Sequence, residues 1–300
     1  MTQGVGDGAA ATRRLLGGRE ADAASRAYWE AEADEYQAEH GAFLAGAGAR
    51  VVDSANDLGG IDQPDGLGTS GAGFVWGPEG LSEAEAGLLG PVEQLGGQLV
   101  LEVGCGAAQC SRWLAARGAR SVGLDIALAQ LRHAGGSVPV VAGSGVALPF
   151  RDHVFDSAFA SYGAVQFVAD LDALFAEVAR VLRPGGRWVF SATHPIRWAF
   201  PDEPGPEGLS VSGSYFDRSP YVEVDEPGGP AVYAEFHRTT GDYVSALRRA
   251  GFSIDTIVEP EWPDWNEQTW GGWSPLRGRH LPGTLIIGCR ADVRSRAVAD

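Results

Sequence analysis

Cysteine, clustered positive charge and long apolar runs are all scarce in this sequence of 300 residues. The three cysteines are an odd number without the spacing of metal ligands, so we expect reduced thiols, no disulfide framework and no zinc or other metal site. No apolar run approaches the roughly 20 residues of a membrane-spanning helix, and residues 1–18 hold two arginines but no apolar signal region. We therefore expect a cytoplasmic protein with no membrane partner.

Positive charge is outweighed throughout the chain. Acidic residues outnumber basic ones by 39 to 23, the formal net charge is -16, and the basic residues form no run. A protein that holds phosphate backbones normally presents clustered basic side chains. We therefore expect no nucleic-acid partner and a small molecule as the substrate. A homodimer is compatible with the sequence, which does not decide the oligomeric state.

What the sequence does contain is a nucleotide-type motif. Residues 99–103 (LVLEV) predict a short buried strand, and Gly104-Cys105-Gly106 predicts a tight turn that leaves little room for side chains. A helix is expected over 108–117, followed by a second strand at 121–124 that ends at Asp125. This order of strand, glycine turn, helix, strand and acid is typical of an open parallel sheet that binds a nucleotide-like ligand.

The turn EVGCG at 102–106 resembles the first motif, E/D-x-G-x-G, of class I S-adenosylmethionine-dependent methyltransferases. Asp125 matches the acid that these enzymes use on the ribose hydroxyls of the cofactor. A dinucleotide site is the rival interpretation, but its G-x-G-x-x-G motif would need a third glycine where this chain has Gln109. The segments ALPFRDHVFD at 147–156 and VLRPGG at 181–186 are similar to later motifs of the family, in the same order.

The resemblance implies a Rossmann-like α/β fold. It would be a doubly wound, seven-stranded mixed sheet, mostly parallel with an antiparallel final strand, with an N-terminal helical segment and a β insertion (cap) after the fifth strand. The expected organisation is a tail, helical segment and flexible loop over the active site (1–97), a cofactor-binding core (98–194), the cap and acceptor pocket (195–238), the completion of the sheet (239–290) and a second tail (291–300).

Four segments outside the core carry separate expectations. Residues 1–18 are small and polar, which predicts disorder. Residues 47–73 are rich in Gly, Asp and Ser and predict either a disordered loop or a lid. Residues 211–216 and 221–224 alternate as exposed strands do and predict the cap. The four tryptophans of 262–273 would form either a rim of the acceptor pocket or a flap packed over the sheet edge.

The N-terminal helical segment, residues 20–46, shares a second motif with the family. Trp29, Tyr36 and His40 resemble the W-x-x-x-A-x-x-Y-x-x-x-H segment that precedes the first strand in some of these enzymes. There the helix folds over the cofactor, and its tyrosine can reach the methionine end. The alternative is that Tyr28, Trp29 and Tyr36 are simply the apolar face of a packing helix.

One position departs from the family pattern. The third strand often ends in an Asp that takes the adenine amino group, and this chain has Gly143-Ser144-Gly145 there. Ser144 could supply a neutral hydrogen bond of about 1 kcal/mol, or a backbone group could substitute. The residues expected to bind S-adenosylmethionine and its product S-adenosylhomocysteine are Tyr28, Tyr36, Glu102, Gly104, Cys105, Gly106, Asp125, Ile126, Gly143, Ser144, Gly145, Ser161, Tyr162 and Gln166.

A hydroxyl acceptor needs a base near the transferred methyl group, and neutral imidazole is suited to that task. His194, at the tip of the fifth strand, is the first candidate, and the alternative for it is a structural histidine in a strand-end turn. His237 is the second candidate, His40 the third, and Tyr162 also faces the expected site. The aromatic residues that would either wall the acceptor pocket or pack the cap are Trp198, Phe200, Tyr215, Phe216 and Tyr221.

Together these features predict methyl transfer from S-adenosylmethionine to an O or N atom of a small aromatic or apolar molecule, with C-methylation less favoured. Two alternatives stay open. One is an enzyme that uses the same scaffold for a reaction other than methyl transfer. The other is a regulatory protein that binds the cofactor without chemistry, because fold alone does not decide function.

Overall fold

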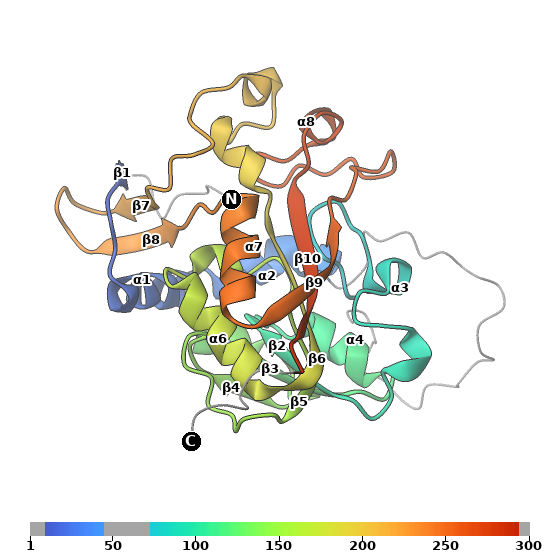
Figure 1. Cartoon of the computed structure of the whole chain (residues 1–300). Coiled ribbons are helices and arrows are strands. Elements are labelled where there is room, and N and C mark those ends of the chain that lie inside the picture. The colour runs from blue at the N-terminus through green and yellow to red at the C-terminus, as the bar shows by residue number, and fades with distance from the viewer. Residues whose placement is uncertain (1–9, 45–72, 294–300) are drawn as a thin grey trace.

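The computed structural model describes residues 10–44 and 73–293, with a seven-stranded mixed sheet at its centre (Figure 1). The strands of this sheet are β2 (Leu99–Val103), β3 (Arg120–Asp125), β4 (Val140–Ala142), β5 (Phe155–Ala160), β6 (Leu182–Thr193), β9 (Phe252–Val258) and β10 (Thr284–Ala291). They follow the order β4-β3-β2-β5-β6-β10-β9. The first five run parallel, and β10 is antiparallel to both β6 and β9. The predicted Rossmann-like sheet with an antiparallel final strand is confirmed.

Helices and loops cover both faces of this sheet (Figure 1). Successive strand residues point to opposite faces, so Leu101 packs with α6 (Leu171–Val181) and α7 (Thr240–Arg249) on one face. Its neighbour Val100 packs with α4 (Gln109–Ala115) and the segment before β2 on the other. The parallel strands are therefore buried on both sides, and their carboxyl ends form one edge of the sheet.

The remaining elements of the core are short. They are α3 (Glu83–Ala86), α5 (Leu128–Arg132), α8 (Pro275–Gly278) and the 3-10 helices η2 (Val92–Gln94), η3 (Val165–Phe167), η4 (Pro195–Ala199) and η5 (Pro206–Leu209). Side-chain caps begin α3, α6 and α7, because Ser82, Asp170 and Thr239 each accept a backbone N–H three residues further on. Such caps satisfy donors that the first helical turn leaves unpaired.

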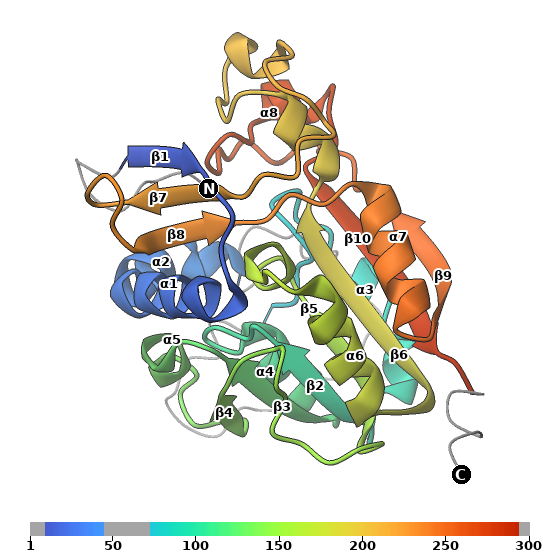
Figure 2. The same ribbon diagram turned by 60° about the vertical axis from the view of Figure 1, so that its left-hand side comes forward.

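A second, three-stranded antiparallel sheet lies above the carboxyl edge and forms the predicted cap (Figure 2). Its strands are β1 (Ala10–Arg13), β7 (Tyr221–Val224) and β8 (Ala231–Glu235), in that order. The N-terminal helices α1 (Gly18–Ala31) and α2 (Ala33–Ala42) lie beneath it, and α1 is the helix that packs on the sheet, through Ala21 and Ala24. The cap therefore joins the start of the chain to the insertion after β6.

Three local expectations differ from the structure. Residues 10–13 were expected in a disordered tail, but they form β1, because the open edge of β7 provides backbone partners from Ala10↔Val224 to Arg13↔Tyr221. Residues 211–216 were expected to be a strand, but Ser212 and Gly213 donate backbone hydrogen bonds to Ala199 instead and fold over η4. The helical segment 20–46 breaks at Glu32 into two helices.

Some expectations fall outside the described residues. These are the tail at 1–9, the end of the helical segment at 45–46, the loop at 47–73 apart from Gly73, and the end of the second tail at 294–300. Within residues 10–44 and 73–293, no helix is both long and apolar enough to cross a membrane.

Candidate cofactor and acceptor site

A cavity lies at the carboxyl ends of β2, β3, β4 and β5, where open α/β sheets bind their ligands. Its floor comes from these strand ends, at residues 103–107, 124–126, 143–145 and 161–164. Helices α1 and α2 close it from above with Asp22, Ser25, Trp29, Tyr36 and Gln37, and the tryptophan-rich loop contributes Trp270. The cavity thus combines residues from both ends of the chain.

The glycine turn after β2 brings backbone to the cavity wall. Gly104 has a φ of 73°, and a Cβ built on it would lie 2.5 Å from the Cβ of Ala164. The N–H groups of Gly104 and Cys105 donate to Leu124 O at 2.7 and 3.0 Å, which ties the turn to the end of β3. Only glycine fits at position 104, because it tolerates a positive φ and has no side chain.

Asp125, at the tip of β3, is 8% exposed and held by backbone donors. Its Oδ2 accepts from Gly106 N at 2.8 Å, and its Oδ1 accepts from Ala127 N at 2.9 Å. Burial raises the pKa of this carboxyl, and the two hydrogen bonds oppose that shift. The carboxylate is therefore oriented toward the cavity, and its remaining lone pairs can accept from vicinal hydroxyl groups.

Three glutamines form a chain along the cavity that the sequence did not suggest. Gln109 Nε2 donates to Gln37 Oε1 at 2.8 Å, and Gln37 Nε2 donates to Gln130 Oε1 at 3.0 Å. Gln130 is 3% exposed, and its Nε2 has no hydrogen-bond partner among the described residues. A buried amide donor without a partner is costly, so a ligand with acceptor groups fits here. Together with the Gly104 turn and Asp125, it makes the cavity suitable for the cofactor implied by the motif.

Glu102 lines the cavity, but its carboxylate is engaged by its own fold. Its Oε2 accepts from Ser111 N at 3.0 Å and from Ser111 Oγ at 2.5 Å. Burial raises the pKa of Glu102 to about 8, although the Ser111 hydrogen bonds lower it. Glu102 therefore anchors the start of α4 behind the glycine turn.

All the residues expected to bind the cofactor line this cavity except Tyr28 and Gln166. Tyr28 packs edge to face on Tyr233, with ring centroids 4.7 Å apart, and lines a second cavity instead. Gln166 Nε2 donates to Tyr162 O at 2.6 Å, so this side chain supports the loop after β5 from behind. The family resemblance identifies which positions of the chain match the motifs. It does not determine the direction in which a side chain on a helix or loop points.

Tyr162 lines the cavity in an unusual backbone conformation. Its φ is 58°, its N–H donates to Ser191 Oγ at 2.8 Å, and its ring lies edge-on to Trp270. Burial raises the pKa of the phenol above its ordinary value. A phenol that holds its proton so firmly can donate a hydrogen bond but is poorly suited to act as a base.

The second cavity adjoins the first through two shared aromatic residues, Tyr36 and Trp270. Its other lining residues are Tyr28, Glu32, Glu35, Glu39, His40, Asp202, Glu203 and Gly271. The imidazole of His40 stacks on the indole of Trp270, with centroids 4.0 Å apart. Burial lowers the pKa of His40, so the imidazole is neutral near pH 7. This second cavity therefore combines aromatic walls, carboxylates and a neutral imidazole.

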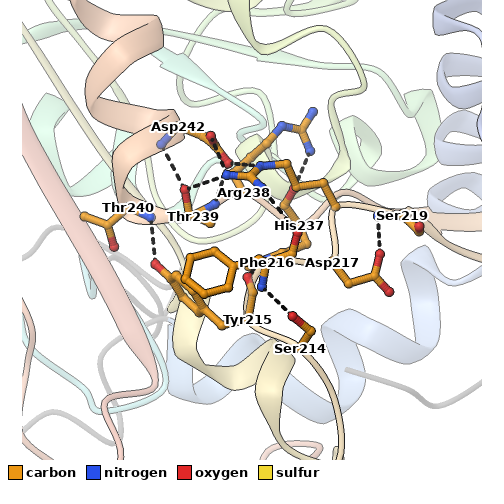
Figure 3. Close-up of polar contacts among 11 residues, drawn as sticks. Ser214, Tyr215, Phe216, Asp217, Ser219, His237, Arg238, Thr239, Thr240 and Asp242 are labelled. Carbon is orange, nitrogen blue, oxygen red and sulfur yellow. Dashed lines mark hydrogen bonds and ion pairs between the residues drawn. The ribbon is translucent and has the colours of Figure 1, made fainter.

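His194 and His237 line neither of these two cavities. In His194, Nε2 lies 2.8 Å from Glu259 Oε1, and Nδ1 accepts from Ile196 N at 3.1 Å. These contacts fit the alternative of a histidine held in a strand-end turn, and β6 lies between β5 and β10 in the sheet. His237 Nε2 lies 2.7 Å from Tyr215 O and helps to hold the segment 214–219 near the start of α7 (Figure 3).

The aromatic residues of the cap likewise line neither cavity. Tyr221 packs on Tyr233, and Trp198 packs on His237, so these side chains stabilise the cap itself. The aromatic walls come instead from Trp29, Tyr36, Phe167 and Trp270 for the cofactor cavity. In the tryptophan-rich loop, Trp270 lines both cavities, and Trp273 is buried at 1% exposure.

Comparisons with known proteins show similarity to methyltransferases. A family profile described as a methyltransferase domain matches residues 101–190. A demethylmenaquinone methyltransferase of Mycobacterium tuberculosis (strain ATCC 25618 / H37Rv) is 42% identical over 197 residues, which cover 63% of this chain and 72% of the relative. One from Corynebacterium kroppenstedtii is 42% identical over 94 residues, which cover 30% of this chain and 40% of that relative. The crystal structure of an S-adenosylmethionine-dependent methyltransferase from Mesorhizobium loti superimposes with a TM-score of 0.55 at 27% identity, covering 71% of this chain and 100% of that one.

Proposed function

The chain belongs to the class I S-adenosylmethionine-dependent methyltransferases, and we propose that it methylates an oxygen or nitrogen atom of a small, ring-bearing molecule that binds in the second cavity. The main support for this proposal is that the two cavities have two lining residues in common. Tyr36 and Trp270 line both cavities, so a ligand in one lies next to a ligand in the other. Methyl transfer requires this adjacency, because donor and acceptor react in line.

Bound S-adenosylmethionine supplies an electrophilic methyl group, so the protein mainly has to bind and orient both reactants. Asp125 would accept hydrogen bonds from the ribose hydroxyls of the cofactor. The backbone of the Gly104 turn would approach the ligand closely, and the free Nε2 of Gln130 would donate to one of its acceptor groups. Tyr36 and Trp270 would separate the methyl donor from bulk water.

The lining of the second cavity supports an uncharged or cationic acceptor with a flat ring. Tyr28, Tyr36 and Trp270 provide aromatic faces for such a ring. Glu32, Glu35 and their neighbouring carboxylates would repel a phosphate or carboxylate group. The relatives named demethylmenaquinone methyltransferases have, by that name, a quinone acceptor, which also favours a ring-bearing acceptor for this chain.

His40 is the residue that we assign as the base. An acceptor O–H or N–H would lose its proton to Nε2 of His40 as the new bond to the methyl carbon forms and the bond from that carbon to the cofactor sulfur breaks, which leaves S-adenosylhomocysteine. Oε2 of Glu39 lies 3.6 Å from this nitrogen and would stabilise the resulting imidazolium.

Cys105, Cys110 and Cys289 are free thiols, which supports the cytoplasm as the proposed compartment.

The test has two steps. Isothermal titration with S-adenosylmethionine, S-adenosylhomocysteine and NAD should show binding of the first two ligands only, lost in Asp125→Ala. Ring compounds with a hydroxyl or amino group are then incubated with S-adenosylmethionine, beside their phosphorylated counterparts, while S-adenosylhomocysteine is measured. We expect turnover with the unphosphorylated set. Turnover confined to the phosphorylated set, or product formed without S-adenosylhomocysteine, would contradict the proposal.

A further inference from the structure

We infer that Asp22, on the N-terminal helix α1, is the carboxylate that recognises the exocyclic amino group of the cofactor's adenine, and that Ser144 positions it. The inference rests on S-adenosylmethionine as the cofactor and is independent of the acceptor. Asp22 is far along the sequence from the end of β4, which is the position where the family motif often has an acid.

The contact that carries the inference joins helix α1 to the loop after β4. Ser144 Oγ donates to Asp22 Oδ2 at 2.9 Å, and both residues line the cofactor cavity. Ser144 Oγ also accepts from Val146 N at 3.4 Å, so the orientation of the hydroxyl is set from both sides. Within the described part of the chain, the bond from Ser144 is the one hydrogen bond that the Asp22 side chain makes. The carboxylate therefore keeps free lone pairs beside the cavity.

The position of this pair matches the purine end of the cavity. Ala142, the last residue of β4, pairs with Asp125 on β3, and Gly143 N donates to Asp125 O at 2.8 Å. The residues after β4 therefore lie next to the carboxylate expected to hold the ribose. Gly143 and Gly145 line the cavity there, and Leu124 and Ile126 supply apolar surface for a flat base. A purine attached to a ribose at Asp125 would extend toward Ser144 and Asp22.

A carboxylate gives this end of the cavity a chemical preference that Ser144 alone lacks. A hydroxyl both donates and accepts, so it would tolerate either an amino or an oxo group on the purine. Here Ser144 donates its hydroxyl hydrogen to Asp22, so the group left to contact the purine is the Asp22 carboxylate, a negatively charged acceptor. Such a group accepts from the 6-amino group of adenine and repels the 6-oxo group of hypoxanthine.

Helix α1 is held in place on both of its flanks, which keeps Asp22 at the cavity. Glu30 accepts from the backbone N–H groups of Leu128, at 2.5 Å, and Ala129, at 3.0 Å, and so caps α5. Ala21 and Ala24 pack on the small sheet from the other side. In Figure 2 the helix lies between the small sheet and α5. The cap thereby contributes to the cofactor site through α1.

The test compares two ligands that differ only in the purine substituent, S-adenosylhomocysteine and S-inosylhomocysteine, by isothermal titration. The wild-type protein should prefer the adenosyl ligand by at least about 10-fold. In Asp22→Asn the side-chain amide can donate to the 6-oxo group. The variant should bind the adenosyl ligand about 10- to 100-fold more weakly and bind the inosyl ligand as well as or better than the wild type does.

Two further variants serve as comparisons. Ser144→Ala should weaken adenosyl binding but keep the preference, because Asp22 remains. Asp34→Asn is the matched control, since Asp34 is on α2, contacts His133 and does not line the cavity. It should bind both ligands as the wild type does.

The ratio of the two affinities is measured on one protein, so partial unfolding of a variant does not change it. An unchanged ratio in Asp22→Asn would overturn the inference, whether both ligands bind normally or both are weakened equally. None of these measurements needs an acceptor, so they also stand apart from the test of the proposed function.

Discussion

The indole of Trp270 lies parallel to the imidazole of His40, with ring centroids 4.0 Å apart and an interplanar angle of 4°. Trp270 belongs to the loop before β10, whereas His40 is near the end of α2. Phe43 and Tyr36 pack edge-on against the same indole, at 5.5 and 6.4 Å. This aromatic group joins α2 to the loop before β10, and two of its members, Tyr36 and Trp270, line both cavities as a shared wall.

Removal of this wall should affect the acceptor more than the cofactor. In Trp270→Ala we expect a higher KM for the acceptor and a lower kcat, with a smaller change in S-adenosylhomocysteine affinity. The loss of a buried tryptophan should also cost about 3–5 kcal/mol of unfolding free energy. Steady-state kinetics, titration and chemical denaturation measure these effects. Trp270→Phe keeps an aromatic face and should retain most of the activity; an unchanged acceptor KM in Trp270→Ala would contradict the shared-wall interpretation.

Replacement of the proposed base should change the rate and its pH dependence together. In His40→Gln we expect kcat at pH 7 to fall about 10²- to 10⁴-fold, as for loss of a general base, with S-adenosylhomocysteine binding retained. Burial lowers the pKa of His40, so wild-type kcat should rise with pH through a value below 6.5, and the variant should lose that limb. His280→Gln changes an exposed histidine and should behave as the wild type. If His40→Gln keeps the acidic limb, the base is another group.

The glycine turn allows steric contact to be separated from backbone strain. Gly104→Ala would place a Cβ 2.5 Å from Ala164 Cβ at a positive φ, whereas Gly97→Ala meets no atom within 4 Å at a similar φ of 79°. We expect strain to destabilise both variants by about 1–3 kcal/mol, and the contact with Ala164 to destabilise Gly104→Ala further. Only Gly104→Ala should also weaken S-adenosylmethionine binding. Chemical denaturation measures the stability of the two variants, and isothermal titration measures their affinity for S-adenosylmethionine. Equal affinities in the two variants would mean that the turn does not shape the cavity.

Glu79 should make stability depend on pH. It is 2% exposed, its Oε2 accepts from Thr284 Oγ1 at 2.7 Å, and burial raises its pKa to about 7 from 4.5. Because the folded-state pKa lies above the unfolded one, its stabilising contribution is complete below about pH 4.5 and is lost as pH rises through 7. The loss is on the order of 3 kcal/mol.

Thermal denaturation from pH 4 to 9 tests this contribution. Glu79→Gln stays neutral and should show a flatter profile between pH 5 and 8 than the wild type. Burial also raises the pKa values of Glu83 and Glu102, so part of the slope will remain. Glu261 is exposed, and Glu261→Gln should leave the profile unchanged. Identical slopes for Glu79→Gln and the wild type would show that Glu79 titrates normally.

The sequence predicted most of the core because the signals there are local. A run such as LVLEV at 99–103 is apolar enough to be a buried strand, and the glycines at 104 and 106 supply the positive φ values, 73° and 51°, of the turn that follows it. Asp125 follows β3 directly, so its place at the carboxyl edge was implied once the strand was recognised. These features depend on neighbouring residues along the chain.

The sequence by itself therefore determined the cofactor-binding motif and the succession of core strands along the chain. Only the tertiary structure decided what closes the site. The Asp22–Ser144 pair, the chain of glutamines through Gln37 and the His40–Trp270 stack each join residues far apart in the sequence. Such contacts depend on which face α1 and α2 turn toward the cavity, and that face is set by packing against the small sheet and α5. No local pattern encodes that orientation, because a helix of given amphipathicity can pack against more than one partner.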